Sequence, residues 1–307
     1  MSRLGRHLAG GLDPVKLARN IGMEPPDPWQ IRVLRDPAPR ELLVIHRQGG
    51  KSVTASVAAV HAALFDPGAL VLVVSPSQRQ SAELFRTMLT LYRGLGRPVS
   101  AEAENALSVF LENGSRIVAL PSDPVTVRGF SSVKLLIVDE AAFVDDEMMA
   151  AVRPMLAVSH GRLLVMGTPY GRRGWFYEAS QSREFRVTKV TAAECPRITP
   201  EFLAAERIAL GEWKYQQEYE CIFGDVQGRL FASADLEAMF NARWLPEGAT
   251  ATSLDGSPPL LRIAAKPSTE KPAKRCTSFD GRHAFNDGQC MWLCGAEQPR
   301  ITAGGAA

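Results

Sequence analysis

The stretch LLVIHRQGGKS, residues 42–52, decides how this chain is expected to fold. It opens with four consecutive apolar residues, and its last six residues are polar, rich in glycine and followed by a helix-like segment. This pattern predicts a strand, a tight loop and a helix, with Gly-Lys-Ser at the turn. Such a turn directs backbone N–H groups and a helix N-terminus toward one point, where proteins hold polyphosphates. Ile45 stands where G-x-x-x-x-G-K-[ST] has its first glycine, so the loop alone does not decide nucleotide binding.

Apolar runs alternate with amphipathic segments beyond this loop, and strands separated by helices indicate a largely parallel sheet covered on both faces. The predicted strands are residues 41–46, 69–75, 115–120, 134–139, 162–167 and 185–190. The predicted helices are residues 52–65, 78–93, 146–158 and 174–180, and then 200–210 and 212–221 with no strand between them. We therefore expect an α/β fold with a small helical lid after the sheet.

Bulk composition limits the classes of function. The chain has 307 residues, 46% of them hydrophobic and 22% charged, which is ordinary for a globular protein with a full core. A net charge of +2 argues neither for nor against nucleic acid. No run approaches the ~18 apolar residues of a membrane helix, and no secretory signal is evident. Five cysteines do not suggest a disulfide framework, so we expect a cytoplasmic protein without membrane contact.

Two further polar clusters follow predicted strands. Asp139 and Glu140 come directly after Leu-Leu-Ile-Val, at the end of a strand where open α/β sheets place ligands. In P-loop ATPases the first such carboxylate holds the Mg²⁺ hydration shell and the second polarises the attacking water. Gly167-Thr168-Pro169 ends another apolar strand, and the Thr168 hydroxyl is a candidate sensor of the γ-phosphate. A solvated strand end and a plain turn are the structural alternatives for these two clusters.

Taken together, these motifs resemble the ATPase domain of phage terminase large subunits, the motors that package double-stranded DNA into procapsids. That family carries a deviant Walker A loop, R-Q-x-G-K-[ST], matched at residues 47–52, so Ile45 fits the family pattern. Pro28-Trp29-Gln30 resembles its adenine-contacting element, Asp139-Glu140 its Walker B end, and Gly167-Thr168-Pro169 its coupling motif. The resemblance covers residues 25–225 and implies a P-loop NTPase fold of the RecA/helicase-like type.

The resemblance also implies a role for each matched residue. Lys51 would neutralise the β- and γ-phosphates of ATP, Ser52 would ligate Mg²⁺, and Asp139 would hold the metal through its water shell. Glu140 would orient and deprotonate the attacking water. The other implied roles are adenine recognition by Gln30, phosphate sensing by Arg47, coupling by Thr168 and phosphate binding by the remaining loop residues, Gln48, Gly49 and Gly50.

Three assignments concern arginines outside the loop. Arg128, in Thr-Val-Arg-Gly-Phe, resembles a family element proposed to supply an arginine finger to the neighbouring subunit. A surface arginine beside a turn glycine is the alternative. Arg172 and Arg173 are candidate contacts to a DNA backbone, with a solvated turn as the alternative.

The predicted domains are an N-terminal arm (1–24), the ATPase core (25–195), a helical lid or linker (196–240) and a poorly ordered tail or nuclease remnant (241–307). The tail is rich in Pro, Ser, Thr, Ala and Gly. Asp225, Asp235, Glu237 and later acids follow no convincing strand, so we expect no competent nuclease site. A zinc site is a weak alternative for the last polar residues, because the spacing of Cys276, His283, Cys290 and Cys294 matches no common knuckle.

The leading functional hypothesis is an ATP-driven DNA-translocating subunit that works in a homo-oligomeric ring in the bacterial host cytoplasm. Its expected partners are double-stranded DNA, a terminase small subunit and the portal protein of the procapsid. The alternatives are another nucleic-acid-dependent P-loop ATPase of helicase type and a non-catalytic prophage remnant. A helicase of that class needs a second RecA-like domain, for which the sequence shows no signal.

Overall fold

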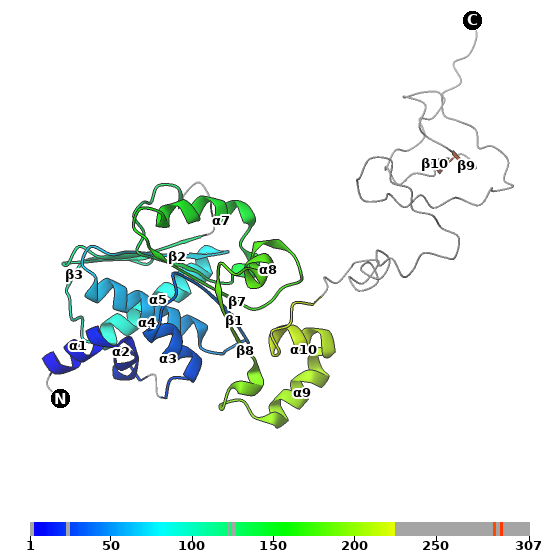
Figure 1. Cartoon of the computed structure of the whole chain (residues 1–307), viewed down its shortest axis with the longest axis horizontal. Helices are drawn as coiled ribbons and strands as arrows, with labels where there is room; N and C mark the ends of the chain where they lie inside the picture. The colour runs from blue at the N-terminus through cyan, green and yellow to red at the C-terminus, as the bar shows by residue number, and fades with distance from the viewer. Residues whose placement is uncertain are drawn as a thin grey trace, which may run out of the picture. The chain divides into compact units, whose positions relative to one another are not determined.

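The computed structural model describes residues 3–22, 25–121, 123, 127–224, 285–286 and 289–290. The chain divides into two units, Met1–Met239 and Phe240–Ala307 (Figure 1). In the second unit, β9 (Phe285–Asn286) pairs antiparallel with β10 (Gln289–Cys290). The first unit holds the sheet and every helix described below. No helix among the described residues is both long and apolar enough to cross a membrane.

An eight-stranded sheet forms the centre of the first unit, in the order β3-β4-β5-β2-β6-β7-β1-β8. Every pairing from β5 to β8 is parallel, and the β3-β4 edge is antiparallel. The strands are β1 (Arg40–Ile45), β2 (Leu70–Ser75), β3 (Ala101–Glu104), β4 (Ser108–Leu111), β5 (Arg116–Pro121), β6 (Leu135–Val138), β7 (Arg162–Gly167) and β8 (Arg186–Val190). The predicted α/β class and its mainly parallel sheet are confirmed.

Alternate strand residues pack against two helical layers, because successive side chains point to opposite faces of a sheet. One face, with Leu43 and Ile45 of β1, packs against α3 (Pro28–Arg35), α4 (Lys51–Phe65) and α5 (Gln78–Gly94). The other face, with Leu42 and Val44, packs against α7 (Asp146–Val152) and α8 (Gly174–Gln181). Figure 1 shows these two layers on opposite sides of the sheet. The central strands β1, β2, β6 and β7 are therefore buried on both faces, as their unbroken apolar sequences predicted.

The N-terminal segment adds three helices that the sequence did not suggest: α1 (Arg3–Leu12), α2 (Pro14–Asn20) and α3. Pro14 and Pro28 each stand at the start of a helix, where a missing N–H costs nothing. The Asp13 side chain accepts a hydrogen bond from the Val15 N–H and so caps α2. Val15 and Ala18 are fully buried in the same core cluster as α4, so α2 is packed against the body of the domain.

Two short helices follow the sheet, α9 (Pro200–Leu210) and α10 (Glu212–Glu218), in agreement with the predicted helical segments. The predicted helix over residues 146–158 is shorter in the structure. α7 ends at Val152 and a 3-10 turn, Arg153–Leu156, follows because Pro154 cannot continue an α-helix. The 3-10 turn Ala141–Phe143 lies directly after β6 and the acidic pair.

Candidate active site

The sheet order brings three polar loops together at the carboxyl ends of the parallel strands, the edge referred to below. β6, β7 and β1 are parallel neighbours, with Val138 level with Val165 and Gly167 level with Val44. The loop after β1, the acidic pair after β6 and the Gly-Thr-Pro turn after β7 therefore emerge side by side. This is the edge at which open parallel sheets place their ligands.

The loop between β1 and α4 has the backbone that its sequence requires. Gly50 caps α4 with φ +89°, a left-handed conformation that glycine adopts without strain. A Cβ at Gly49 would lie 2.5 Å from Ile45 Cγ2, so any larger residue there would push against the strand. Gln48 also has positive φ, at +60°. The two glycines therefore let the chain turn from the strand into the helix N-terminus within a few residues.

Lys51 lies inside this turn and is only 9% exposed. Its Nζ donates hydrogen bonds to the carbonyl oxygens of Ile45, at 2.7 Å, and His46, at 3.0 Å. Burial lowers the pKa of the ammonium, and the negative charge of Glu140 is the strongest of the influences that raise it. The lysine is thus held at the loop by carbonyl groups and faces the acidic pair across the strand ends.

The acidic pair is asymmetric. Asp139 is 9% exposed, and burial, with the neighbouring Glu140 carboxylate, raises its pKa to about 6. Its Oδ1 accepts a hydrogen bond from the Glu140 N–H at 2.9 Å. Glu140 has φ +46° and is partly exposed, so its backbone turns sharply and presents a second carboxylate at the edge. Non-glycine residues in this conformation are uncommon and gather at functional sites.

The Gly-Thr-Pro turn packs against the acidic loop. A Cβ at Gly167 would lie 3.2 Å from both the Ala141 backbone nitrogen and Phe176 Cζ, so glycine permits this close approach. Thr168 is buried directly after it. The structure therefore brings Thr168 to the same edge as Lys51 and Asp139. Its role as a phosphate sensor stays a prediction.

Gln30 is buried, and both ends of its amide are engaged within the protein. Its Oε1 accepts from the Asp27 N–H at 2.8 Å, and its Nε2 donates to Thr54 Oγ1 at 3.1 Å. A Cβ on Gly50 would come within 2.7 Å of the same Nε2. Gln30 thus fastens the start of α3 to the start of α4, beside the loop. Contact with adenine would require the amide to exchange these partners, so that assignment stays a prediction.

Arg47, Gln48 and Ser52 are all exposed at the loop surface. Arg47 is tied to α10: its backbone N–H donates to the Glu218 carbonyl at 3.1 Å, and its Nε lies 3.5 Å from Glu218 Oε2. No sequence pattern pointed to Glu218, because the contact joins segments far apart in the chain.

The other predicted arginines lie at the surface. Arg128 Nη2 is 3.9 Å from Glu147 Oε1 on α7, with both side chains largely exposed. This position leaves its role toward a neighbouring subunit as a prediction. Arg172 Nε donates to the Phe223 carbonyl at 3.0 Å, and Arg173 is exposed beside it. The residues of the alternative zinc site, Cys276, His283, Cys290 and Cys294, fall outside the residues whose side chains are described.

Two supporting residues, His46 and Arg197, escaped sequence reasoning. His46 is buried under the loop, its Nδ1 is 2.7 Å from the Arg47 carbonyl, and burial lowers its pKa. Arg197 makes two hydrogen bonds, at 2.8 and 2.7 Å, to the Asp27 carboxylate at the start of α3. The His46 contact supports the loop, and the Arg197 contacts support the start of α3. The only sequence signal for either is Asp27-Pro28, which is typical of a helix start.

Hard oxygen donors at the edge suit Mg²⁺, which binds one or two protein oxygens and keeps several waters. Ser52 is exposed in the first turn of α4, and the buried Asp139 carboxylate has a raised pKa that a divalent cation would lower. The two predicted metal-binding residues therefore fit the ion chemically. Among the described residues there is no preformed cluster of three or more His, Cys, Asp or Glu side chains suited to a metal.

Comparison with known proteins agrees with this architecture. The curated terminase large subunit of Thermus virus P23-45 is 28% identical, over 48% of this chain and 34% of its own length. The chain thus spans about a third of the length of the curated relatives it matches. The solved ATPase domain of the Thermus phage P74-26 large terminase superposes with a TM-score of 0.62 at 23% identity, covering 69% of this chain and 99% of that one. This likeness shows a shared fold.

A family model settles the relationship. The model described as terminase large subunit, T4likevirus-type, N-terminal, matches residues 42–238. That span begins in β1 and includes the glycine-rich loop, the acidic pair and the Gly-Thr-Pro turn, the three features that the parallel sheet gathers at one edge. By this match the chain belongs to the terminase large subunit N-terminal family.

Proposed function

We propose that this chain is the ATP-hydrolysing motor part of a phage-type terminase and couples hydrolysis to the movement of double-stranded DNA into a procapsid. One observation carries the proposal: a buried lysine in the glycine-rich loop after β1 faces two carboxylates at the end of β6, a parallel strand separated from β1 only by β7. A cation and an acidic pair in this arrangement suit the transfer of a phosphoryl group to water.

Nucleotide binding would use the loop first. The N–H groups at the start of α4 and the Lys51 ammonium would receive the β- and γ-phosphates, and the phosphate oxygens would replace the two carbonyl oxygens that Lys51 now contacts. The Ser52 hydroxyl and the Asp139 carboxylate would hold Mg²⁺, which neutralises developing charge on the phosphates when bound.

Hydrolysis would depend on Glu140. Its backbone is left-handed and its side chain is more exposed than that of the buried Asp139. In this proposal Asp139 serves the metal and Glu140 accepts a proton from the attacking water. Thr168 is buried directly after β7, the strand between β6 and β1, and would register the loss of the γ-phosphate. Arg47 would carry the same signal to α10 through Glu218.

The test separates binding from chemistry. We expect Lys51→Ala to weaken binding of a fluorescent ATP analogue by about tenfold or more, a loss of about 1.4 kcal/mol. Glu140→Gln should keep that binding and lose steady-state phosphate release by about two orders of magnitude or more. If Glu140→Gln hydrolyses ATP as fast as the wild type, the assigned chemistry is wrong. If the wild type binds but never hydrolyses ATP, with or without DNA, the chain is a nucleotide-binding remnant.

The remaining assignments extend the same proposal. The expected partners are a terminase small subunit, a portal protein and further copies of this chain in a ring, where Arg128 would act on the neighbouring subunit. We also expect no DNA cleavage by this chain. Robust nicking of a plasmid by the pure protein with Mg²⁺ or Mn²⁺ would contradict that expectation.

A further inference from the structure

A cavity opens at the other end of the parallel strands from the glycine-rich loop, where β6 and β7 begin. Its volume is about 370 Å³. Its apolar surface includes Leu34 from α3, Ala58 from α4 and Leu135 from β6. Cavities of this size that combine apolar walls with a few polar groups are typical of small-molecule sites.

The polar side chains that line this cavity share one property, which is that none of those described is acidic. They are Arg35, His61, Lys134 and Arg162. Two of these cations are neutralised outside the cavity lining: Arg35 Nη2 is 2.7 Å from Asp13 Oδ2, and Lys134 Nζ is 2.8 Å from Asp66 Oδ2.

Arg162 differs from these two. No described carboxylate lies within ion-pair distance of its guanidinium. One Nη donates to the Val33 carbonyl at 3.2 Å, and its buried Nε has no hydrogen-bond partner among the described residues. Burial lowers the pKa of the guanidinium to about 10, which still leaves it charged at neutral pH. A largely buried charge without a close counterion is costly, and an anion beside it would remove that cost.

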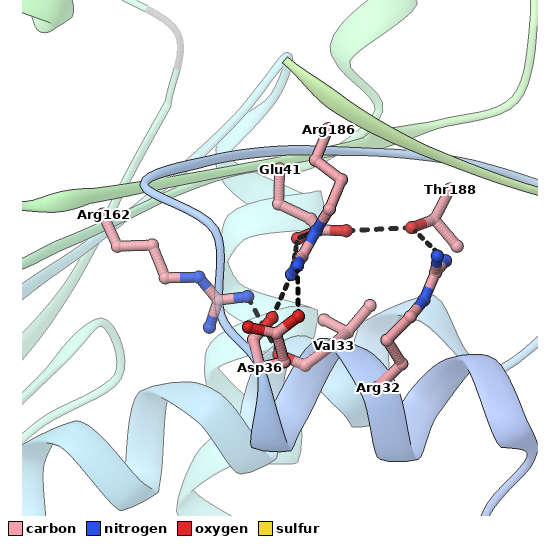
Figure 2. Close-up of polar contacts among 7 residues, drawn as sticks. All are labelled: Arg32, Val33, Asp36, Glu41, Arg162, Arg186 and Thr188. Atoms are coloured by element: carbon pink, nitrogen blue, oxygen red, sulfur yellow. Dashed lines mark hydrogen bonds and ion pairs between the residues drawn. The ribbon is translucent and has the colours of Figure 1, made fainter.

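Glu41, whose negative charge acts on Arg162, does not fill this role. Figure 2 shows the Glu41 carboxylate turned to Arg186 and Thr188, while Arg162 lies to one side and reaches Val33. Glu41 Oε2 accepts from Arg186 Nε at 2.9 Å and Nη2 at 2.7 Å, and Oε1 accepts from Thr188 Oγ1 at 2.8 Å. Asp36 is likewise paired with Arg186. Both of these acids are thus committed to other donors.

We propose that this cavity binds a small organic monocarboxylate, with its apolar body against Leu34, Ala58 and Leu135 and its carboxylate toward Arg162. The apolar walls select a hydrocarbon chain or ring, and the uncompensated guanidinium selects one negative charge, which a planar carboxylate matches in shape. The site is separate from the glycine-rich loop because it lies at the opposite ends of the strands.

Isothermal titration calorimetry on the full chain with octanoate tests the proposal, with octanamide and inorganic phosphate as matched probes. Octanamide keeps the apolar body without the charge, and phosphate keeps the charge without the apolar body. We expect octanoate to bind at least about tenfold more tightly than either.

Two variants locate the site. Arg162→Gln should weaken octanoate binding about tenfold or more, whereas Arg32→Gln, which alters an exposed arginine bonded to Thr188 Oγ1, should leave it unchanged. Ala62→Met fills the cavity from a partly exposed lining position and should also block octanoate, which guards against misfolding of the Arg162 variant. Unchanged binding in Arg162→Gln and Ala62→Met, equal binding of octanamide or phosphate, or no octanoate binding by the wild type would each overturn the proposal.

Discussion

The Glu41 carboxylate offers a sharp test of how β1 is held to its neighbour β8. It is fully buried and accepts three hydrogen bonds, two from Arg186 and one from Thr188 (Figure 2). Glu41→Gln preserves the size of the side chain but removes its charge. Breaking a buried ion pair on one side costs about 3–5 kcal/mol. The exposed Asp36 still compensates Arg186 in the variant, so the lower end of that range, about 3 kcal/mol, applies.

Equilibrium urea unfolding at neutral pH measures this loss directly, with an unchanged m-value expected. For a domain of this size the same change lowers Tm by about 6–12 °C. Glu83→Gln is the matched control, because Glu83 pairs with Arg86 at an exposed position and its loss should cost less than about 0.5 kcal/mol. A double-mutant cycle with Arg186→Gln should recover a coupling of about 1–3 kcal/mol. A loss below about 1 kcal/mol in Glu41→Gln would refute this reasoning.

Two further perturbations follow from local geometry. Gly161→Ala places a Cβ 2.0 Å from the Val133 carbonyl oxygen and should lower the free energy of unfolding in urea by more than roughly 4 kcal/mol. Gly94→Ala is the control, because its Cβ meets nothing, and it should be neutral or slightly stabilising. Equal stabilities of the two variants would contradict the packing described. The Arg197 guanidinium lowers the pKa of Asp27 below its ordinary value of 3.8, so this pair stabilises the fold above that pH and its contribution is lost as the pH falls through the lowered pKa. Asp27→Asn should therefore be less stable than the wild type at neutral pH, and the difference should shrink in acid unfolding experiments; a constant difference would argue against the ion pair.

Sequence reasoning located the strands well for a physical reason. Strands buried on both faces are unbroken apolar runs, so β1, β2, β6 and β7 could be predicted from the sequence without any contact information. The antiparallel edge was not, because β3, with the sequence Ala-Glu-Ala-Glu, is partly exposed and carries no apolar signal. The N-terminal helices were also missed. Their prolines resemble helix breakers in a sequence, whereas both stand at helix starts.

The candidate site divides in the same way. Lys51, Asp139 and Thr168 each follow or adjoin a recognisable strand, and the parallel topology brings them together. The contacts that support them join distant segments: Arg47 with Glu218, and Asp27 with Arg197. Such pairs form only through tertiary packing, and neither residue of a pair lies in a local sequence pattern that identifies its partner. The engaged amide of Gln30 is a further example, since its bond to Thr54 spans 24 positions.

The most direct test of the motor proposal is steady-state ATP hydrolysis by the full chain, with and without double-stranded DNA, in the wild type and in Glu140→Gln. The proposal predicts that DNA stimulates turnover by the wild type and that Glu140→Gln abolishes turnover under both conditions. A wild type without turnover, or a Glu140→Gln variant that retains it, would contradict the assignment of the acidic pair.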